Sequence, residues 1–254
     1  MPHESLGSAS SARVIAAHEA RRLAEIFPRL TLADRIDVVR DGLAGRVVFT
    51  TSFGIEDQVI VDAIFTQDLA IDVVTFDTGR LFSETYDVWA RTEDHYRKRV
   101  TVFHPEREHV EALVARQGVN GFRASIEARQ ACCGVRKVEL LERALAGATA
   151  WITGIRADQS PERASAPFAV FDDRHQVLKV NPLLDWTRGR VVDHVRARGI
   201  PVNSLHARGF LTIGCAPCTR ALTPGEPERA GRWWWEQEEA KECGLHPEYF
   251  APRP

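Results

Sequence analysis

The 254-residue chain has little net charge, because 33 lysines and arginines stand against 35 aspartates and glutamates and give a formal net charge of -2. This balance excludes a generally basic nucleic-acid binder but leaves room for a local cluster of cations. Long apolar runs are missing as well, since no stretch approaches the ~18 residues that a membrane-spanning helix needs. The beginning of the sequence also lacks the basic start and apolar stretch of a signal peptide. These absences predict a cytoplasmic protein that binds neither membranes nor nucleic acid.

Cysteine is scarce, and the whole chain contains five, which is an odd number. An odd number argues against a closed disulfide framework, and a chain of this length can bury a core without disulfides. The five are grouped: Cys132 adjoins Cys133, Cys215 and Cys218 form a Cys-x-x-Cys pair, and Cys243 stands alone. This grouping predicts one site made by four thiolates and a separate fifth thiol.

Strand-like and helix-like segments alternate along most of the chain, without an internal repeat. The predicted strands are residues 46–50, 71–77, 100–104 and 150–154, with a hairpin of 168–171 and 177–180. The predicted helices are residues 13–27, 31–45, 58–65, 83–97, 106–117, 133–146 and 191–198. Such alternation is typical of α/β proteins, in which helices flank a mostly parallel twisted sheet. We expect a flexible tail at 1–12, a single α/β domain at 13–235 and a C-terminal segment at 236–254 that carries Cys243.

Two polar loops follow neighbouring predicted strands. They consist of Ser52, Phe53 and Gly54, and of Asp77, Thr78 and Gly79. Ligands of open α/β sheets bind beyond the carboxyl ends of the strands, where free backbone N–H groups and a helix N-terminus favour phosphate. Neither loop is a Walker loop or a Gly-x-Gly-x-x-Gly fingerprint, so each alone also fits a plain structural turn. Together they favour a nucleotide site.

The two cysteine pairs leave several kinds of site open. Buried inert cysteines and a redox-active Cys-x-x-Cys are two alternatives, although neither explains why two tight pairs occur together. Four thiolates suit a tetrahedral zinc ion, but structural zinc usually takes two Cys-x-x-Cys pairs, whereas Cys132 and Cys133 are adjacent. A wider iron–sulfur cluster also takes four thiolates. The spacing alone leaves zinc and iron–sulfur equally open.

The lone cysteine, Cys243, lies in a polar stretch between Lys241 and His246. Nearby cations lower the pKa of a thiol and favour the thiolate, which is the nucleophilic form. A terminal segment can also move between two sites, as a thiol-transfer cycle requires. An inert thiol remains the alternative.

Several cations occur close to these features. Lys137 follows Cys133 by four residues, so one helix face can carry both. Four arginines follow a strand end or the last paired cysteine: Arg156, Arg163, Arg229 and Arg232. The guanidinium group donates paired hydrogen bonds to phosphate and sulfate. These residues are candidates for an anion-binding cluster, although each arginine alone also fits a solvated surface position.

Three longer motifs join these features: Cys132-Cys133-Gly134-Val135-Arg136-Lys137, Ile213-Gly214-Cys215-Ala216-Pro217-Cys218-Thr219-Arg220 and Glu242-Cys243-Gly244-Leu245-His246. With these motifs the chain resembles the assimilatory adenylyl-sulfate (APS) reductases, the iron–sulfur branch of the phosphoadenylyl-sulfate (PAPS)/APS reductase family, from about residue 46 to residue 246. The resemblance implies an adenine-nucleotide α-hydrolase-like fold. It also implies a [4Fe-4S] cluster on Cys132, Cys133, Cys215 and Cys218.

The resemblance implies an activity as well. Family members convert adenylyl sulfate to sulfite and AMP in sulfate assimilation, with thioredoxin or a glutaredoxin-like protein as reductant and an S-sulfocysteine intermediate. Members with both cysteine pairs prefer adenylyl sulfate, and PAPS reduction or dual specificity is the alternative. The expected catalytic residues are Cys243, Lys137 and His246. The four arginines and Lys137 are expected to hold the phosphosulfate, and Ser52, Gly54 and Asp77 to line the nucleotide end. A homo-oligomer is expected.

Two other classes remain as remote alternatives. An iron–sulfur tRNA-thiolating enzyme of the ATP-pyrophosphatase type predicts a Ser-Gly-Gly-x-Asp-Ser loop and a basic surface, whereas this chain has Ser-Phe-Gly-Ile-Glu-Asp and is slightly acidic. A non-enzymatic iron–sulfur sensor needs neither Cys243 nor the strand-end loops. Sulfite release from adenylyl sulfate with thioredoxin separates all three classes.

Overall fold

The computed structural model describes residues 5–236 and residue 245. Its α-helices are α1 (Ser5–Ile26), α2 (Leu32–Gly42), α3 (Ile55–Thr66), α4 (Ser83–Tyr96), α5 (Arg107–Gln117), α6 (Ile126–Cys133), α7 (Glu139–Leu145) and α8 (Arg188–Arg198). Its strands are β1 (Arg46–Thr51), β2 (Asp72–Phe76), β3 (Thr101–Phe103), β4 (Ala148–Ile152), β5 (Ala169–Asp172) and β6 (Val177–Val180). None of these helices combines the length and apolar character that crossing a lipid bilayer requires.

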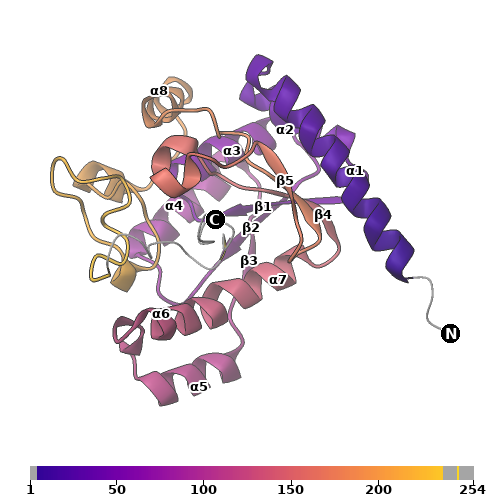
Figure 1. Cartoon of the computed structure of the whole chain (residues 1–254). Coiled ribbons are helices and arrows are strands. Elements are labelled where there is room, and N and C mark those ends of the chain that lie inside the picture. Colours follow the sequence, from indigo (N-terminus) through magenta and orange to yellow (C-terminus); the bar gives the residue numbers. More distant parts are fainter. Residues whose placement is uncertain (1–4, 237–244, 246–254) are drawn as a thin grey trace.

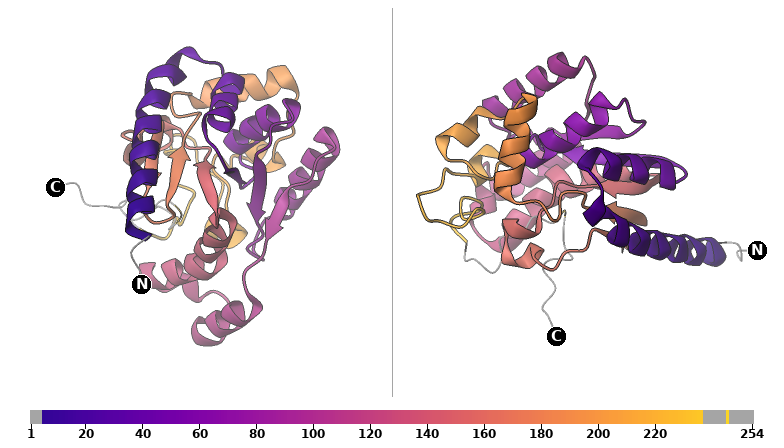
Figure 2. Two further views of the ribbon diagram at one scale, coloured as in Figure 1. Left: turned by 90° about the vertical axis from the view of Figure 1, so that its right-hand side faces the viewer. Right: turned by 90° about the horizontal axis from the view of Figure 1, so that it is seen from above.

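The strands form one sheet in the order β3-β2-β1-β4-β6-β5 (Figure 1). All neighbouring strands run parallel except β5 and β6, which form an antiparallel pair. The prediction of a mostly parallel α/β sheet is therefore confirmed, and so is the pairing of residues 168–171 with 177–180. Parallel strands need crossover helices, and these cover both faces of the sheet (Figure 2).

The alternation of side chains along β1 explains the two layers of helices. Val47 and Phe49 face the larger core, which α1, α2, α3 and α8 cover, whereas Val48 faces a smaller core with Trp151 and Leu141 of α7. All five side chains are buried. A strand with both faces buried reads as a continuous apolar run, which is why residues 46–50 could be recognised without alternation.

Some element boundaries differ from the prediction. Helix α1 begins at Ser5, within the stretch expected to be a tail. Helix α2 begins after the N-cap Thr31 as predicted, since Thr31 Oγ1 accepts the Asp34 N–H at 3.2 Å, but it ends at Gly42. Gly45 instead adopts φ 107°, and a Cβ there would lie 2.6 Å from Cγ2 of Thr149. This glycine is needed for the close approach to the start of β4.

The segment after α8 folds across the opposite side of the molecule from α1 (Figures 1 and 2). Backbone hydrogen bonds hold it together, including Leu222 N–H to the Gly209 carbonyl at 2.9 Å and Arg220 N–H to the Gly231 carbonyl at 3.0 Å. A further bond joins Ala216 N–H to the Arg80 carbonyl at 2.8 Å. This segment therefore reaches the carboxyl ends of the strands without forming a strand of the sheet.

Candidate active site

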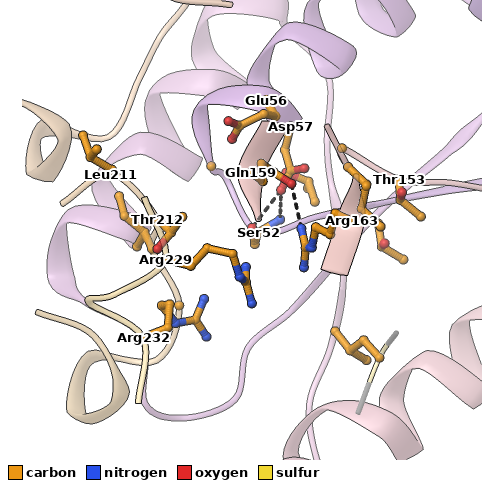
Figure 3. A pocket seen from close by; sticks show the side chains of 18 of the residues that line it. Ser52, Glu56, Asp57, Thr153, Gln159, Arg163, Leu211, Thr212, Arg229 and Arg232 are labelled. Atoms are coloured by element: carbon orange, nitrogen blue, oxygen red, sulfur yellow. Dashed lines mark hydrogen bonds between the residues drawn. The ribbon is translucent and has the colours of Figure 1, made fainter. Parts of the chain in front are cut away.

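A cavity lies beyond the carboxyl ends of β1, β2 and β4 (Figure 3). The strand ends supply Thr51, Phe76 and Thr153, and the segment after α8 supplies the facing wall. This is the place where ligands bind in open α/β sheets. Several residues predicted to bind substrate or to act in catalysis line this substrate cavity: Ser52, Gly54, Lys137, Arg163, Arg229 and Arg232.

Cations from three distant segments meet in this cavity (Figure 3). Arg163 donates its Nη1–H to Oε1 of Gln159 at 2.7 Å. Arg232 passes close to Gly214, where a Cβ would lie 2.5 Å from Nη2 of the guanidinium. The glycine that precedes Cys215 in the sequence motif thus leaves room for the guanidinium in this position, and a larger residue would displace it.

The loop after β1 borders the cavity, but not with every residue predicted to do so. Phe53 has a left-handed backbone, with φ 57°, and its ring is fully buried and stacks on Trp89 with 5.6 Å between centroids. A left-handed conformation costs a non-glycine residue about 1–3 kcal/mol, which burial of the ring offsets. Phe53 therefore holds the loop in shape and does not line the cavity, whereas Ser52 and Gly54 do.

A carboxylate that sequence reasoning missed, Asp57, receives the donors of this loop. Its Oδ2 accepts the Ser52 backbone N–H at 2.6 Å and the Ser52 hydroxyl at 2.8 Å. Burial raises the pKa of Asp57 to about 6, and the hydrogen bonds from Ser52 oppose this shift. Asp57 is therefore ionised at neutral pH.

Arg156 lies outside the lining of the cavity, in contrast to the role predicted for it. It is fully buried, its Nε–H donates to Glu56 at 3.0 Å, and its Nη2 bonds both carboxylate oxygens of Glu228 at 2.8 and 2.9 Å. It also pairs with Asp158. Four of the five N–H donors of this guanidinium serve three carboxylates, and the side chain is fully buried outside the cavity lining. Arg156 instead fixes the segment that carries Arg229 against the start of α3.

Residues 77–79 also lie outside this lining, although the prediction placed them at the nucleotide. Oδ1 of Asp77 accepts the Gly79 N–H at 2.8 Å, which closes the loop on itself. The Thr78 hydroxyl lies 3.3 Å from Sγ of Cys215, and the Thr78 carbonyl accepts Nη1–H of Arg136 at 2.5 Å. This loop thus supports the cysteines.

The four paired cysteines line a second cavity next to the first. Cys132 and Cys133 end α6, and Cys215 and Cys218 lie at the short 3-10 turn η7 (Ala216–Cys218). The rest of the lining of this cysteine cavity is cationic, aromatic or proline: Arg80, Phe122, Arg129, Arg136, Lys137, Pro217, Arg232 and Trp233. Within the described part of the chain, no group of three or more His, Cys, Asp or Glu side chains is arranged to hold a metal ion. The four cysteines instead border a common cavity.

The donors around the cysteine cavity fit an anionic group bound by thiolates. The Nε atoms of Arg136 and Arg232 are buried, and neither finds a hydrogen-bond partner among residues 5–236 and 245. Such orphaned donors are costly unless something accepts from them. Burial raises the pKa of Cys218 to about 11, so this thiol stays protonated unless a metal displaces the proton. The cavity therefore suits a negatively charged metal–sulfur cluster.

Lys137 lines both cavities, as do Arg232 and Trp233. The predicted helix over 133–146 is not regular, because Gly134–Val138 forms a π-helical turn, η3, between α6 and α7. Such turns insert an extra residue and are frequent at functional sites. The turn carries Lys137 from the cysteines to the wall between the two cavities.

Cys243 and His246, the predicted nucleophile and its neighbour, lie outside the described residues. Leu245 is described, and it lines the substrate cavity together with Lys137. It also packs against the apolar cluster that contains Cys133, Cys215 and Trp233. Leu245 therefore lies at the site, between the two cavities' apolar walls.

Sequence reasoning missed other parts of the lining. Gln159 and Thr212 border the cavity, and Glu228 completes the buried network of Arg156. The sequence does contain a feature that could have identified Asp57 as a site residue, since this residue lies in the first turn of a helix that follows a buried strand. Thr212 had none, because the segment after α8 shows no periodic pattern.

Comparisons with known proteins agree with this architecture. A family model described as the phosphoadenosine phosphosulfate reductase domain matches residues 46–221. An adenosine 5'-phosphosulfate reductase of Sinorhizobium fredii (strain USDA 257) is 54% identical over 228 residues, which cover 90% of this chain and 90% of that protein. The protein of that name from Allochromatium vinosum is 49% identical over 207 residues, or 82% of this chain and 81% of that protein.

Solved structures extend the comparison to the fold. A phosphoadenylyl-sulfate (PAPS) reductase from Candida auris matches with a TM-score of 0.68 at 23% identity, covering 79% of this chain and 96% of that one. Yeast FAD synthetase matches with a TM-score of 0.50 at 16% identity, covering 96% and 86%. The fold is thus shared with these two proteins.

Proposed function

The chain belongs to the phosphoadenosine phosphosulfate reductase family, and on that premise we propose that it reduces adenylyl sulfate to sulfite and AMP in sulfate assimilation. The observation that carries the proposal is the meeting of four cations in a strand-end cavity beside a cavity lined by four cysteines. Relatives about half identical over most of the chain are named for this substrate. Reduction of PAPS is the second candidate, because the family model carries that name.

The cationic side of the substrate cavity suits the phosphosulfate group. Lys137, Arg229 and Arg232 supply positive charge there, and Arg163 adds a fourth cation beside Gln159. These cations would neutralise both acidic groups and stabilise the charge that develops on the departing phosphate. AMP is a good leaving group, so the task of the protein is mainly to position the sulfate.

Cys243 is the proposed nucleophile. Leu245 lines the cavity, and two residues of chain reach at most about 7 Å, so a thiolate two residues before Leu245 can reach the bound sulfate. Its sulfur attacks the sulfate sulfur, the bond from that sulfur to the phosphate oxygen breaks, and AMP departs with the bonding electrons. The product is an S-sulfocysteine, and His246 assists by keeping the thiol ionised.

A dithiol protein, thioredoxin or a glutaredoxin-like protein, completes the cycle. One of its thiolates attacks Sγ of Cys243, sulfite leaves, and a mixed disulfide forms. The second thiol of the partner resolves this disulfide and restores the Cys243 thiol. The dithiol thus supplies the two electrons that reduce the sulfate sulfur. A reducing cytoplasm suits this chemistry, and a homo-oligomer stays a prediction that light scattering tests.

We further propose that Cys132, Cys133, Cys215 and Cys218 hold a [4Fe-4S] cluster. The four cysteines line one cavity, and Arg136 and Arg232, which line it too, each have a buried Nε–H without a partner among the described residues. When bound, such a cluster supplies a compact negative charge beside the substrate site. Lys137, in the wall between the cavities, offsets that charge on the side that faces the substrate.

Turnover on adenylyl sulfate and on its 3'-phosphorylated form, with thioredoxin as reductant and iron measured on the same sample, tests the proposal. We expect sulfite release from adenylyl sulfate and about four iron atoms per chain. An iron-containing sample that releases no sulfite from either nucleotide would contradict the proposed activity. Turnover without iron would contradict the proposed cofactor alone.

A further inference from the structure

The loop after β1 has the form of a phosphate-binding helix N-terminus, but a carboxylate of the protein already occupies it. Gly54 is the N-cap of α3, and the amide of Ser52 and its hydroxyl both donate to Asp57 Oδ2. The Gly54 amide also donates to this carboxylate. A bound phosphate would use such donors. Here they serve Asp57, and the loop presents a negative charge to the cavity.

The carboxylate of Asp57 is held from its other side as well. A Cβ on Gly154, directly after Thr153 at the end of β4, would collide with Oδ1 of Asp57 and would lie 3.3 Å from Cβ of Glu56. The missing side chain at Gly154 lets the carboxylate stand against the backbone. The position of Asp57 is therefore fixed by hydrogen bonds on one oxygen and by packing on the other.

The substrate cavity thus has opposite charges at its two sides (Figure 3). Arg229 and Arg232 lie on one side, and Glu56 and Asp57 lie on the other, where Arg163 is bonded to Gln159. The charge of Glu56 is offset by Arg156, 3.0 Å away. The partners of Asp57 are uncharged donors and the neighbouring Glu56, so its negative charge acts on whatever lies in the cavity.

We propose that Asp57 selects adenylyl sulfate over nucleotides that carry a second phosphate on the ribose. The inference rests on the proposed function, which seats the phosphosulfate among Lys137, Arg229 and Arg232 and directs the nucleoside toward the loop after β1. A carboxylate there accepts hydrogen bonds from ribose hydroxyls, as acidic residues do in dinucleotide sites that reject a ribose phosphate. A phosphate at the same place would meet like charge and would find the Ser52 donors already used.

Calorimetric titration of the purified, iron-loaded protein with AMP and with adenosine 3',5'-bisphosphate tests this proposal. The wild type is expected to bind AMP more tightly by about tenfold or more, since 1.4 kcal/mol of repulsion suffices. In Asp57→Asn, which keeps the shape and removes the charge, this preference should fall by about tenfold, mainly through tighter binding of the bisphosphate. Asp57→Ser removes the charge with a different side chain and should behave alike.

Asp72→Asn is the matched control, because it makes the same charge change at the far end of β2. Its preference should equal that of the wild type. An unchanged preference in both Asp57 variants, or equal weakening of both nucleotides, would overturn the role of Asp57. A wild type that binds both nucleotides equally would overturn the selection alone. A wild type that binds neither would overturn the proposed function, and the selection with it.

Discussion

The two adjoining cavities are built on different electrostatic plans. The substrate cavity is divided, with Arg229 and Arg232 on one side and Glu56 and Asp57 on the other. Every charged side chain that lines the cysteine cavity within the described residues, apart from the thiols themselves, is a cation. The first plan suits a molecule with an anionic end and a neutral end that must bind and leave. The second suits a resident anion that stays.

The two plans meet at a shared wall of Lys137, Arg232 and Trp233. A cation in such a wall attracts a substrate anion and a resident anion at once, so each site changes the field at the other. Variants that change one cavity and leave the other intact would show whether the two sites act separately in spite of this wall.

The largest expected effect is confined to the substrate cavity. Cys243→Ser should lower the rate of sulfite release by at least about 10³-fold, because the nucleophile is lost. Iron content should not change, since this residue is not among the four proposed ligands. A variant that still released sulfite at the normal rate would remove Cys243 from the mechanism.

The converse change is in the cysteine cavity. Cys218→Ser should lose the iron, which elemental analysis and the visible absorption spectrum measure. Titration with AMP should show binding weakened by less than about tenfold, because Arg163 and Arg229 line the substrate cavity alone. Complete loss of AMP binding would mean that the two cavities form a single unit. Retention of a full complement of iron would remove Cys218 from the ligand set.

A third variant tests the buried ion pairs that Arg156 forms beside the substrate cavity. Arg156→Gln leaves Glu56 and Glu228 with only the longer contacts to Arg188, at 4.0 and 3.4 Å, and should lower the free energy of unfolding by about 3 kcal/mol. Denaturant unfolding measures the loss. Arg174→Gln, which breaks a pair that is half exposed on both sides, should cost about 0.5 kcal/mol or less. Normal stability with a raised KM would instead restore Arg156 as a substrate ligand.

Leu245 offers a smaller test at the shared wall. Leu245→Ala removes apolar contact with the cysteine cluster and should lower kcat/KM by about tenfold, because the segment that carries Cys243 would dock less firmly. Iron content and the affinity for AMP should be kept. An unchanged kcat/KM would show that this contact does not position the nucleophile.

An effect on stability alone is the pH dependence that Asp57 confers. Its pKa is raised from the ordinary 3.8 to about 6, so the folded state favours the protonated carboxyl. The protonated carboxyl therefore contributes to the free energy of unfolding. This contribution is fully present below about pH 4 and is lost as the pH rises through 6. The stability of Asp57→Asn relative to the wild type should therefore grow by about 1–3 kcal/mol from pH 4 to 7, as unfolding in buffered urea measures. A constant difference across this range would contradict the raised pKa.

Local patterns predicted much of this molecule. The strand of residues 46–50 and the cap at Thr31 are short-range signals, and both elements occur where expected. The pairing of cysteines in the sequence likewise predicts that four of them share one site, and the four line one cavity. Such features depend on neighbours within a few residues, so the sequence carries them directly.

The roles of single charged residues were not predictable in this way. Arg156 and Arg163 are seven residues apart, and in the sequence both fit an anion-binding role equally well. In the structure, Arg156 instead bonds Glu56 and Glu228, whereas Arg163 lines the cavity. The difference comes from two carboxylates that lie 72 and 100 positions from Arg156 in the sequence. The role of Asp57 was not predictable either, because the position of its carboxylate depends on Gly154, which is distant in the sequence.

The sequence by itself determined the layered α/β architecture and the grouping of thiols, because periodicity and spacing are properties of neighbouring residues. Only the tertiary structure decided which cations face a ligand and which are neutralised inside the protein. That choice depends on Coulomb partners brought within about 3 Å by the folding of distant segments.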